Sequence, residues 1–212
     1  MSKAFEQLKS AVSQFFDNKI IATGDALGEL TIEVSVGDLV SVLKSLRDED
    51  DFQFEQMIDI AGVDYLTYGL DEWNTQHATS EGFERGRQNL TQSRWERERY
   101  AVVYHLLSVT LNQRIRVKVF VDENSMIVPS VVDLWHGANW FEREAFDLFG
   151  LLFNGHPDLR RLLTDYGFIG HPFRKDFPVI GELEMRYDEN TEQCVYEPVS
   201  IEERILVPRV IR

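Results

Sequence analysis

The chain has 212 residues, of which 43% are hydrophobic and 14 are phenylalanine, enough apolar side chains to bury the core of one ordinary domain. With 36 acidic and 22 basic residues, its formal charge of −14 argues against binding to nucleic acid or to an anionic membrane surface. Its single cysteine, Cys194, excludes an intrachain disulfide framework.

The first hundred residues alternate helical and strand patterns. Apolar residues recur at helical spacing near the start: Phe5, Leu8, Val12 and Phe15. Strict alternation predicts a half-buried strand over 31–36, and Asp38 is placed to cap a second helix that carries apolar residues up to Leu46. A buried strand is predicted over 57–63. Residues 71–99 are polar and mixed in charge, and they are interpreted as a solvated loop inserted between strands.

Two further strands are predicted over 100–109 and 114–121. In the second, four apolar residues alternate with Arg and Lys: Ile115, Val117, Val119 and Val121. The short polar turn between the two strands favours an antiparallel hairpin. We therefore expect an α+β fold over residues 1–137, a mixed β-sheet with helices packed on it.

The longest central stretch without Asp, Glu, Lys or Arg, residues 100–113, has 14 residues. A membrane-spanning helix needs about 20. The first residues have neither the layout of a secretion signal nor that of a transit peptide. We expect the chain to attach to a membrane only through partners.

A helix of unusual composition is predicted over 140–149. Asn139 is placed to cap it, Glu142 to complete a capping box, and Gly150 to end it in a left-handed conformation. Aromatic and aliphatic side chains surround the helix, and Glu142 and Glu144 fall among them.

Carboxylates in such surroundings need donors, because an unpaired buried charge is costly. The predicted suppliers are Arg143, which can reach Asp147 one turn on, and the pair Arg160 and Arg161. A helix that is apolar nearly all round predicts a second covering surface, which we take to be another chain.

The rest of the chain is divided into a signature helix and loop segment, 138–178, and an extended C-terminal arm, 179–212. Residues 182–203 contain eight acidic residues and one basic residue. Apolar residues alternate along 183–187, and 193–197 can pair back as a hairpin. An arm with apolar residues but no core of its own is either disordered or laid along a partner, and we expect it to wrap partner subunits.

Motifs for redox or nucleotide cofactors are not found in this sequence. An iron–sulfur cluster needs about four thiolates, and no glycine-rich phosphate or dinucleotide loop is present. A second interpretation makes Glu144, Asp147, His156 and His171 a metal site or an acid–base set of a small metal-dependent hydrolase. However, both histidines stand in Gly-His-Pro steps, where the imidazole typically bonds a backbone carbonyl.

Three stretches carry a resemblance to a known family: Glu-Arg-Glu-Ala-Phe-Asp-Leu-Phe-Gly over 142–150, His-Pro-Asp-Leu-Arg-Arg-Leu-Leu over 156–163, and Gly-His-Pro-Phe-Arg-Lys-Asp-Phe-Pro over 170–178. They resemble the 30-kilodalton subunit, also called the C subunit, of the proton-pumping NADH:quinone oxidoreductase (respiratory complex I). The match is dense over about 100–212 and thinner before. The positions that carry it are Trp140, Glu142, Arg143, Glu144, Asp147, Gly150, His156, Pro157, Arg160, Arg161, His171, Pro172, Arg174, Lys175 and Asp176.

The resemblance implies a cofactor-free structural and assembly subunit of the hydrophilic arm, with interface roles and no catalytic, cofactor or metal site at those positions. It implies packing against the large quinone-site subunit, the D subunit, with the iron–sulfur subunits B and I close by. FMN, iron–sulfur clusters and quinone would be held by other subunits. The implied place is the cytoplasmic face of a bacterial inner membrane, or the matrix face in mitochondria. An equivalent subunit of a related membrane-bound hydrogenase or other-donor complex is the alternative.

Overall fold

The structure is a computed structural model that describes residues 3–68 and 95–201. The chain forms two compact units, one up to Lys175 and one from Asp176 onward, and each is described by itself. The boundaries inferred at residues 137 and 178 stay predictions about domain organisation. No helix in the described part of the chain is both long enough and apolar enough to span a bilayer.

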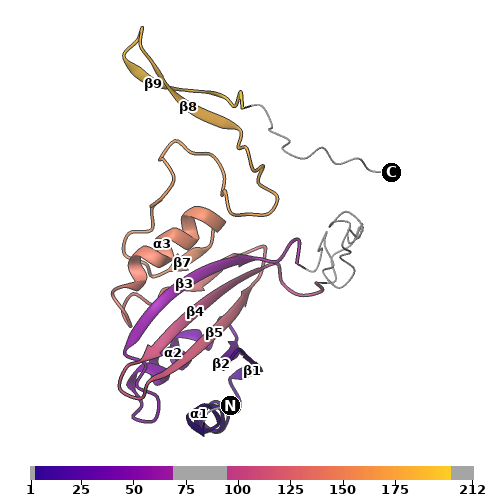
Figure 1. Cartoon of the computed structure of the whole chain (residues 1–212), viewed down its shortest axis with the longest axis vertical. Helices are drawn as coiled ribbons and strands as arrows, with labels where there is room; N and C mark the ends of the chain where they lie inside the picture. Colours follow the sequence, from indigo (N-terminus) through magenta and orange to yellow (C-terminus); the bar gives the residue numbers. More distant parts are fainter. Residues whose placement is uncertain (1–2, 69–94, 202–212) are drawn as a thin grey trace, which may run out of the picture. The chain divides into compact units, whose positions relative to one another are not determined.

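A five-stranded sheet in the order β1-β2-β5-β4-β3 forms the centre of the first unit (Figure 1). Its strands are β1 (Ile20–Ala26), β2 (Glu29–Val34), β3 (Gln56–Asp64), β4 (Tyr100–Ser108) and β5 (Gln113–Val121). β2 and β5 run parallel, and the other neighbours run antiparallel. The predicted mixed sheet and the β4–β5 hairpin are therefore confirmed. The edge strand β1 was not predicted.

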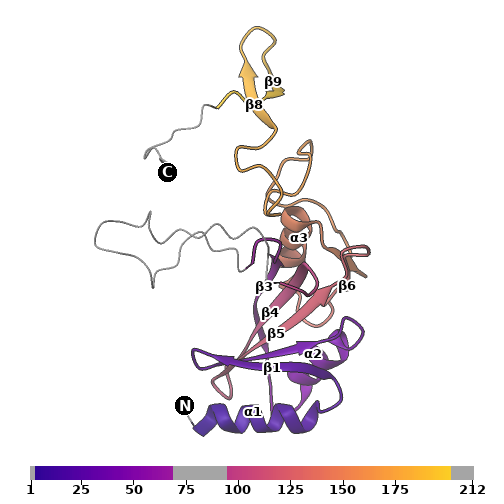
Figure 2. The ribbon, with the colours of Figure 1, turned by 90° about the vertical axis from the view of Figure 1, so that its right-hand side faces the viewer.

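Three helices pack on one face of this sheet: α1 (Lys3–Phe15), α2 (Leu39–Asp48) and α3 (Ala138–Phe149). The alternating residues of β5 predicted to share a face join them in a single core. Figures 1 and 2 show α1 and α2 at the end of the unit that carries β1, and α3 at the other end beside β3. The predicted α+β fold is confirmed.

Two details of the first helices differ from expectation. Phe16, just past α1, is buried, whereas Phe15 is 49% exposed. Asp38 stands at the N-cap of α2, but its side chain makes no bond to the helix. Its carboxylate accepts a hydrogen bond from the Ser35 hydroxyl at 2.8 Å instead.

α3 packs closely on β3. A Cβ atom at Gly62 would lie 2.5 Å from Cδ2 of Phe149, so only glycine lets the strand and the helix approach this far. Two short strands, β6 (Ile127–Pro129) and β7 (Leu152–Asn154), pair in parallel on either side of α3 in the sequence.

The end of the inserted segment is packed at two of its residues, Trp95 and Arg99. Trp95 stacks on Tyr65 with ring centroids 4.4 Å apart, and Arg99 forms an ion pair with Asp64 at 2.8 Å. Trp95 and Arg99 thus pack against the sheet domain, whereas Glu96, Arg97 and Glu98 are exposed, as predicted for a solvated loop. Residues 71–94 of the predicted loop lie outside the described residues.

Between residues 176 and 201, the second unit forms an antiparallel hairpin of β8 (Leu183–Asp188) and β9 (Gln193–Pro198). The hairpin predicted from alternation along 183–187 is confirmed.

Candidate functional site

Glu142 holds the chain segment that precedes α3. The helix begins at Ala138 with Gly137 as N-cap and no side-chain capping bond, so the predicted cap by Asn139 and the capping box were wrong. Glu142 faces the core and is fully buried. Its carboxylate accepts hydrogen bonds from the Ser130 hydroxyl and the Val131 amide, both at 2.7 Å.

Burial raises the pKa of Glu142 to about 7, and the two donors only partly oppose this shift. The Tyr104 hydroxyl is also buried and has no hydrogen-bond partner among the described residues. Burial and the charge of Glu142 both raise the pKa of that hydroxyl. The environment of Glu142 therefore favours its protonated form.

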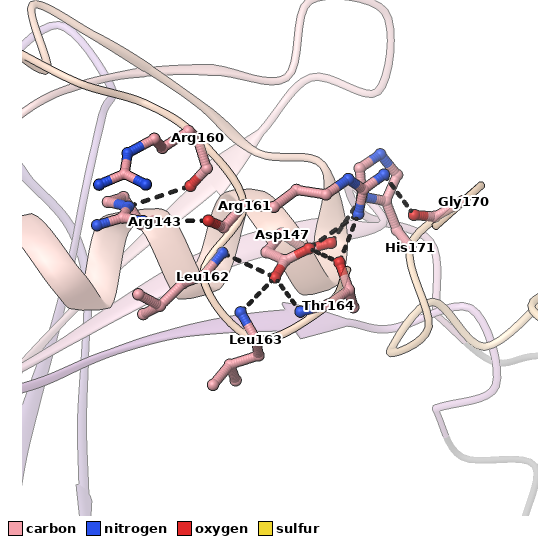
Figure 3. Close-up of polar contacts among 9 residues, drawn as sticks. All are labelled: Arg143, Asp147, Arg160, Arg161, Leu162, Leu163, Thr164, Gly170 and His171. Carbon is pink, nitrogen blue, oxygen red and sulfur yellow. Dashed lines mark hydrogen bonds and ion pairs between the residues drawn. The ribbon is translucent and has the colours of Figure 1, made fainter. Parts of the chain in front are cut away.

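Asp147, in the last turn of α3, accepts the hydrogen bonds that hold the loop after the helix (Figure 3). Its buried carboxylate accepts hydrogen bonds from three consecutive backbone amides, those of Leu162 at 3.0 Å, Leu163 at 2.7 Å and Thr164 at 2.8 Å. The Thr164 hydroxyl and the Arg161 guanidinium also donate to it, the latter at 2.8 Å. Burial alone would raise the pKa of Asp147, but the donors outweigh burial and lower it to about 2.

Of the three arginines proposed as donors, Arg161 reaches the helix carboxylate as predicted. Arg143 does not bond Asp147; its Nε and Nη2 donate to the carbonyls of Arg160 and Arg161, both at 3.1 Å. Arg160 is exposed and pairs with Asp158 at 2.8 Å, so its predicted role as a donor to α3 was wrong. The three loop amides bond one oxygen of Asp147, and Arg161 and the Thr164 hydroxyl bond the other, while Arg143 bonds the loop backbone instead.

The last four carbonyls of α3 each receive a donor. Such groups have no partner within a helix and must be satisfied from outside it. The donors are the amides of Gly150 (2.8 Å) and Phe173 (3.1 Å), Nδ1–H of His171 (2.9 Å) and Nε of Arg174 (2.7 Å). The cation of Arg174 also suits the negative end of the helix dipole.

Gly150 ends the helix with φ +78°, which confirms the predicted left-handed stop. A Cβ atom there would lie 2.4 Å from Nη2 of Arg174. Burial lowers the pKa of His171, which favours the neutral ring, and a bond to a carbonyl oxygen requires the proton on Nδ1.

The imidazole of His156 also bonds a backbone carbonyl. Its Nδ1 accepts from the Asp158 amide at 3.0 Å, which leaves Nε2–H to donate to the Asn139 carbonyl at 3.2 Å. Both Gly-His-Pro imidazoles thus bond backbone carbonyls, as predicted.

The carboxylate–histidine set of the hydrolase interpretation is not assembled. The carboxylate of Asp147 already accepts five hydrogen bonds, and both imidazoles bond backbone carbonyls. Within the described ranges, no three His, Cys, Asp or Glu side chains are grouped so that they could hold a metal ion.

The remaining predicted positions are less constrained. Glu144 is half-buried, as is Pro172, whereas Pro157 is exposed. Lys175 contributes its backbone amide to Asp64 at 2.8 Å, and Asp176 is the first residue of the second unit.

The role of Asp64 was not predicted. Its buried carboxylate accepts two bonds from Arg99, at 2.8 Å each, together with the amides of Leu66 and Lys175. Burial acts to raise the pKa of Asp64, but Arg99 and the two amides hold it below its usual value. The end of β3 is thereby joined to the end of the loop after α3. No sequence signal marked this contact, because Asp64 and Lys175 are 111 residues apart.

Large apolar side chains are exposed along α3 and its loop, although the backbone beneath them is fixed by the contacts above. We refer to these residues as the α3 surface. They are 56–73% exposed: Trp140, Leu163, Tyr166, Ile169 and Phe173.

The fold and this site define an α+β protein that presents an ordered apolar surface on one helix and its loop. The chain belongs to the family of the 30-kilodalton subunit of respiratory-chain NADH dehydrogenase, whose model matches residues 32–183.

Individual relatives agree with the family match. The C subunit of the NADH-quinone oxidoreductase of Legionella pneumophila (strain Corby) is 58% identical over 197 residues, which cover 92% of this chain and 87% of the relative. Its counterpart in Coxiella burnetii (strain Dugway 5J108-111) is 51% identical over 210 residues, 98% and 92% of the two chains. A solved trypsin-resistant fragment (1-134) of Nqo5 is 28% identical with a TM-score of 0.53, and the match covers 74% of this chain and 99% of the fragment.

Proposed function

We propose that this chain acts as the 30-kilodalton subunit of a proton-pumping NADH:quinone oxidoreductase and that its contribution is structural. It supports assembly of the hydrophilic arm, carries no cofactor and supplies no catalytic residue. The relatives named as C subunits of NADH-quinone oxidoreductase match nearly the whole chain, and this favours the NADH enzyme over a related hydrogenase.

The α3 surface is the observation that carries this proposal. Burial of a large apolar side chain contributes about 1.5 to 3 kcal/mol, so five that are more than half exposed leave a sizeable free energy available to a partner. The hydrogen bonds to Asp147 and to the end of α3 fix the backbone of the loop and helix that carry these side chains. Docking then costs little ordering entropy.

The partners we propose are the quinone-site D subunit, with the iron–sulfur subunits B and I nearby, on the cytoplasmic face of a bacterial inner membrane. Electrons would pass from NADH to quinone, and protons would be moved, through FMN, iron–sulfur clusters and quinone on those and other subunits. This chain would hold their positions.

Assembly of the complex tests the structural role. We would replace the gene in its host with a Trp140→Ala/Ile169→Ser variant and measure the complex on blue-native gels stained for NADH oxidation. Loss of about 3 kcal/mol of docking free energy would weaken binding by about 100-fold, so we expect little assembled complex. Thermal unfolding of the purified variant should match that of the wild type, because both side chains point to solvent.

Leu27→Ser is the matched control. Leu27 is fully exposed in the turn between β1 and β2. Figure 2 shows strand β1 at the end of the first unit away from α3. The control should assemble normally. Normal assembly of the Trp140→Ala/Ile169→Ser variant would contradict the proposed role of the α3 surface.

Spectroscopy and metal analysis of the purified chain test the cofactor-free part of the proposal. We expect no visible absorbance and no stoichiometric iron, zinc or manganese. A flavin or a metal that copurifies at one per chain would refute this part.

A further inference from the structure

The two faces of the β8–β9 hairpin differ in chemistry. The strand register places Leu183 opposite Pro198, Met185 opposite Tyr196 and Tyr187 opposite Cys194. Because successive side chains alternate, all six lie on one face, which we term the arm face. The opposite face carries Glu184, Arg186, Asp188, Gln193, Val195 and Glu197.

The apolar side chains of the arm face are exposed to solvent, and so are Arg186 and Gln193 on the opposite face. On the arm face, Met185 is 59% exposed, Tyr187 57% and Tyr196 47%. On the other face, Arg186 pairs with Glu197 at 2.8 Å, and Glu197 is only partly exposed. The arm face thus leaves its apolar side chains in water, while Arg186 and Glu197 on the opposite face pair with each other.

A two-stranded hairpin with an uncovered apolar face is marginally stable in water. Exposed contiguous apolar surface of this kind marks an interaction site. The charges around the arm face indicate what can cover it. Residues 182–198 contain six acidic side chains and one basic one, and the acids lie at both ends of the hairpin and on its rear face.

We infer that the arm face docks on an apolar strip bordered by Lys and Arg side chains on another protein of the same complex. This inference rests on the proposed function. The acidic surroundings select a basic protein surface, since complementary charge steers association and fixes register.

The same charges disfavour the other candidate occupants. Anionic lipid headgroups would repel the hairpin. A second copy of the hairpin would bring the same set of carboxylates against these.

Photo-crosslinking within the native complex tests the inference. Benzoyl-phenylalanine would replace Tyr187 on the arm face or, as a matched control near the same turn, Gln193 on the other face. We expect the probe at 187 to crosslink one other subunit, at a segment with more Lys and Arg than Asp and Glu. The probe at 193 should give about tenfold less product, because side chains on that face point away from the arm face. A lipid adduct, a crosslink to a second copy, a crosslink to an acidic segment, equal yields or no crosslink would each overturn the inference.

Cys194 provides a second measurement without any substitution. It is the only cysteine of the chain, it is exposed, and it lies on the arm face opposite Tyr187. Its alkylation by a maleimide should be at least about tenfold slower in the complex than in the isolated chain. Equal rates would overturn the inference.

The failure of this inference can be distinguished from failure of the proposed function. Blue-native gels of the same sample show whether the chain is in the complex. If the chain is present but the 187 probe fails, the inference falls and the proposed function stands. If the chain is absent from the complex, both fall.

Discussion

The replacement Asp147→Asn tests the hydrogen-bond arrangement beneath the α3 surface. The carboxylate is fully buried and accepts from Leu162, Leu163, Thr164 and Arg161. An amide of the same shape has only one acceptor oxygen and directs its NH₂ group at these donors. Breaking a buried, hydrogen-bonded ion pair costs about 3 to 5 kcal/mol. We expect the free energy of unfolding to fall by about 3 kcal/mol.

The pKa of Asp147 gives an independent estimate. A shift from 3.8 to about 2 corresponds to roughly 2 kcal/mol that favour the folded state. Because the folded-state pKa lies below the unfolded-state pKa, this stabilisation is complete above about pH 4 and is lost as the pH falls through about 2. The difference between wild type and variant should therefore be full at neutral pH and shrink below about pH 4.

Urea unfolding of the full-length chain, followed by circular dichroism, measures both effects. Asp158→Asn is the control, because Asp158 is an exposed carboxylate of the same loop that pairs with Arg160. It should leave stability nearly unchanged. A loss of less than about 1 kcal/mol for Asp147→Asn at about pH 7, or a loss equal at about pH 7 and about pH 3, would refute the reasoning.

Three further changes test other contacts of α3. Gly62→Ala forces a Cβ atom to within 2.5 Å of Phe149 and should lower stability by about 2 kcal/mol, whereas Gly24→Ala, with nothing within 4 Å, should not; equal effects in thermal unfolding would contradict the close approach. For Glu142, whose folded-state pKa is raised from 4.5 to about 7, stability should decline by about 3 kcal/mol as the pH rises from 4.5 past 7. Glu142→Gln should remove most of this dependence of stability on pH, measured from unfolding curves at several pH values. An unchanged pH dependence in the variant would disprove the role given to Glu142. Arg174→Gln removes the donor to the last carbonyl of α3 and should cost about 1 to 2 kcal/mol in urea unfolding; no loss would show that the bond is dispensable.

Local patterns in the sequence predicted much of the fold. Alternation along β5 and along β8 indicated which side chains share a face, since a strand has a period of two. Gly150 marked the end of α3, because many helices end in a left-handed residue and glycine adopts that conformation without a steric cost. The strand β1 has no such signal. It is an edge strand with Gly24 in its middle, and its residues are mostly exposed, so no alternation of buried and exposed side chains marks it.

Contacts between distant residues were harder to predict. By charge, either Arg143 or Arg161 could pair with Asp147. The fold of the loop brings Arg161 within hydrogen-bond distance of that carboxylate. Glu142 fits a capping box by its spacing, yet its side chain points into the core toward Val131. Residue spacing fixes the face of a helix that a side chain occupies, but it does not fix what packs against that face.

The α3 surface and its cover by partner subunits are the central claim, and oxidative footprinting of the isolated chain and of the purified complex tests it most directly. Hydroxyl radicals modify exposed aromatic side chains, so Trp140, Tyr166 and Phe173 should all react readily in the isolated chain. In the complex we expect all three to be strongly protected, while Leu27 reacts equally in both samples. Equal oxidation of the three aromatic residues in the complex and in the isolated chain would contradict the account.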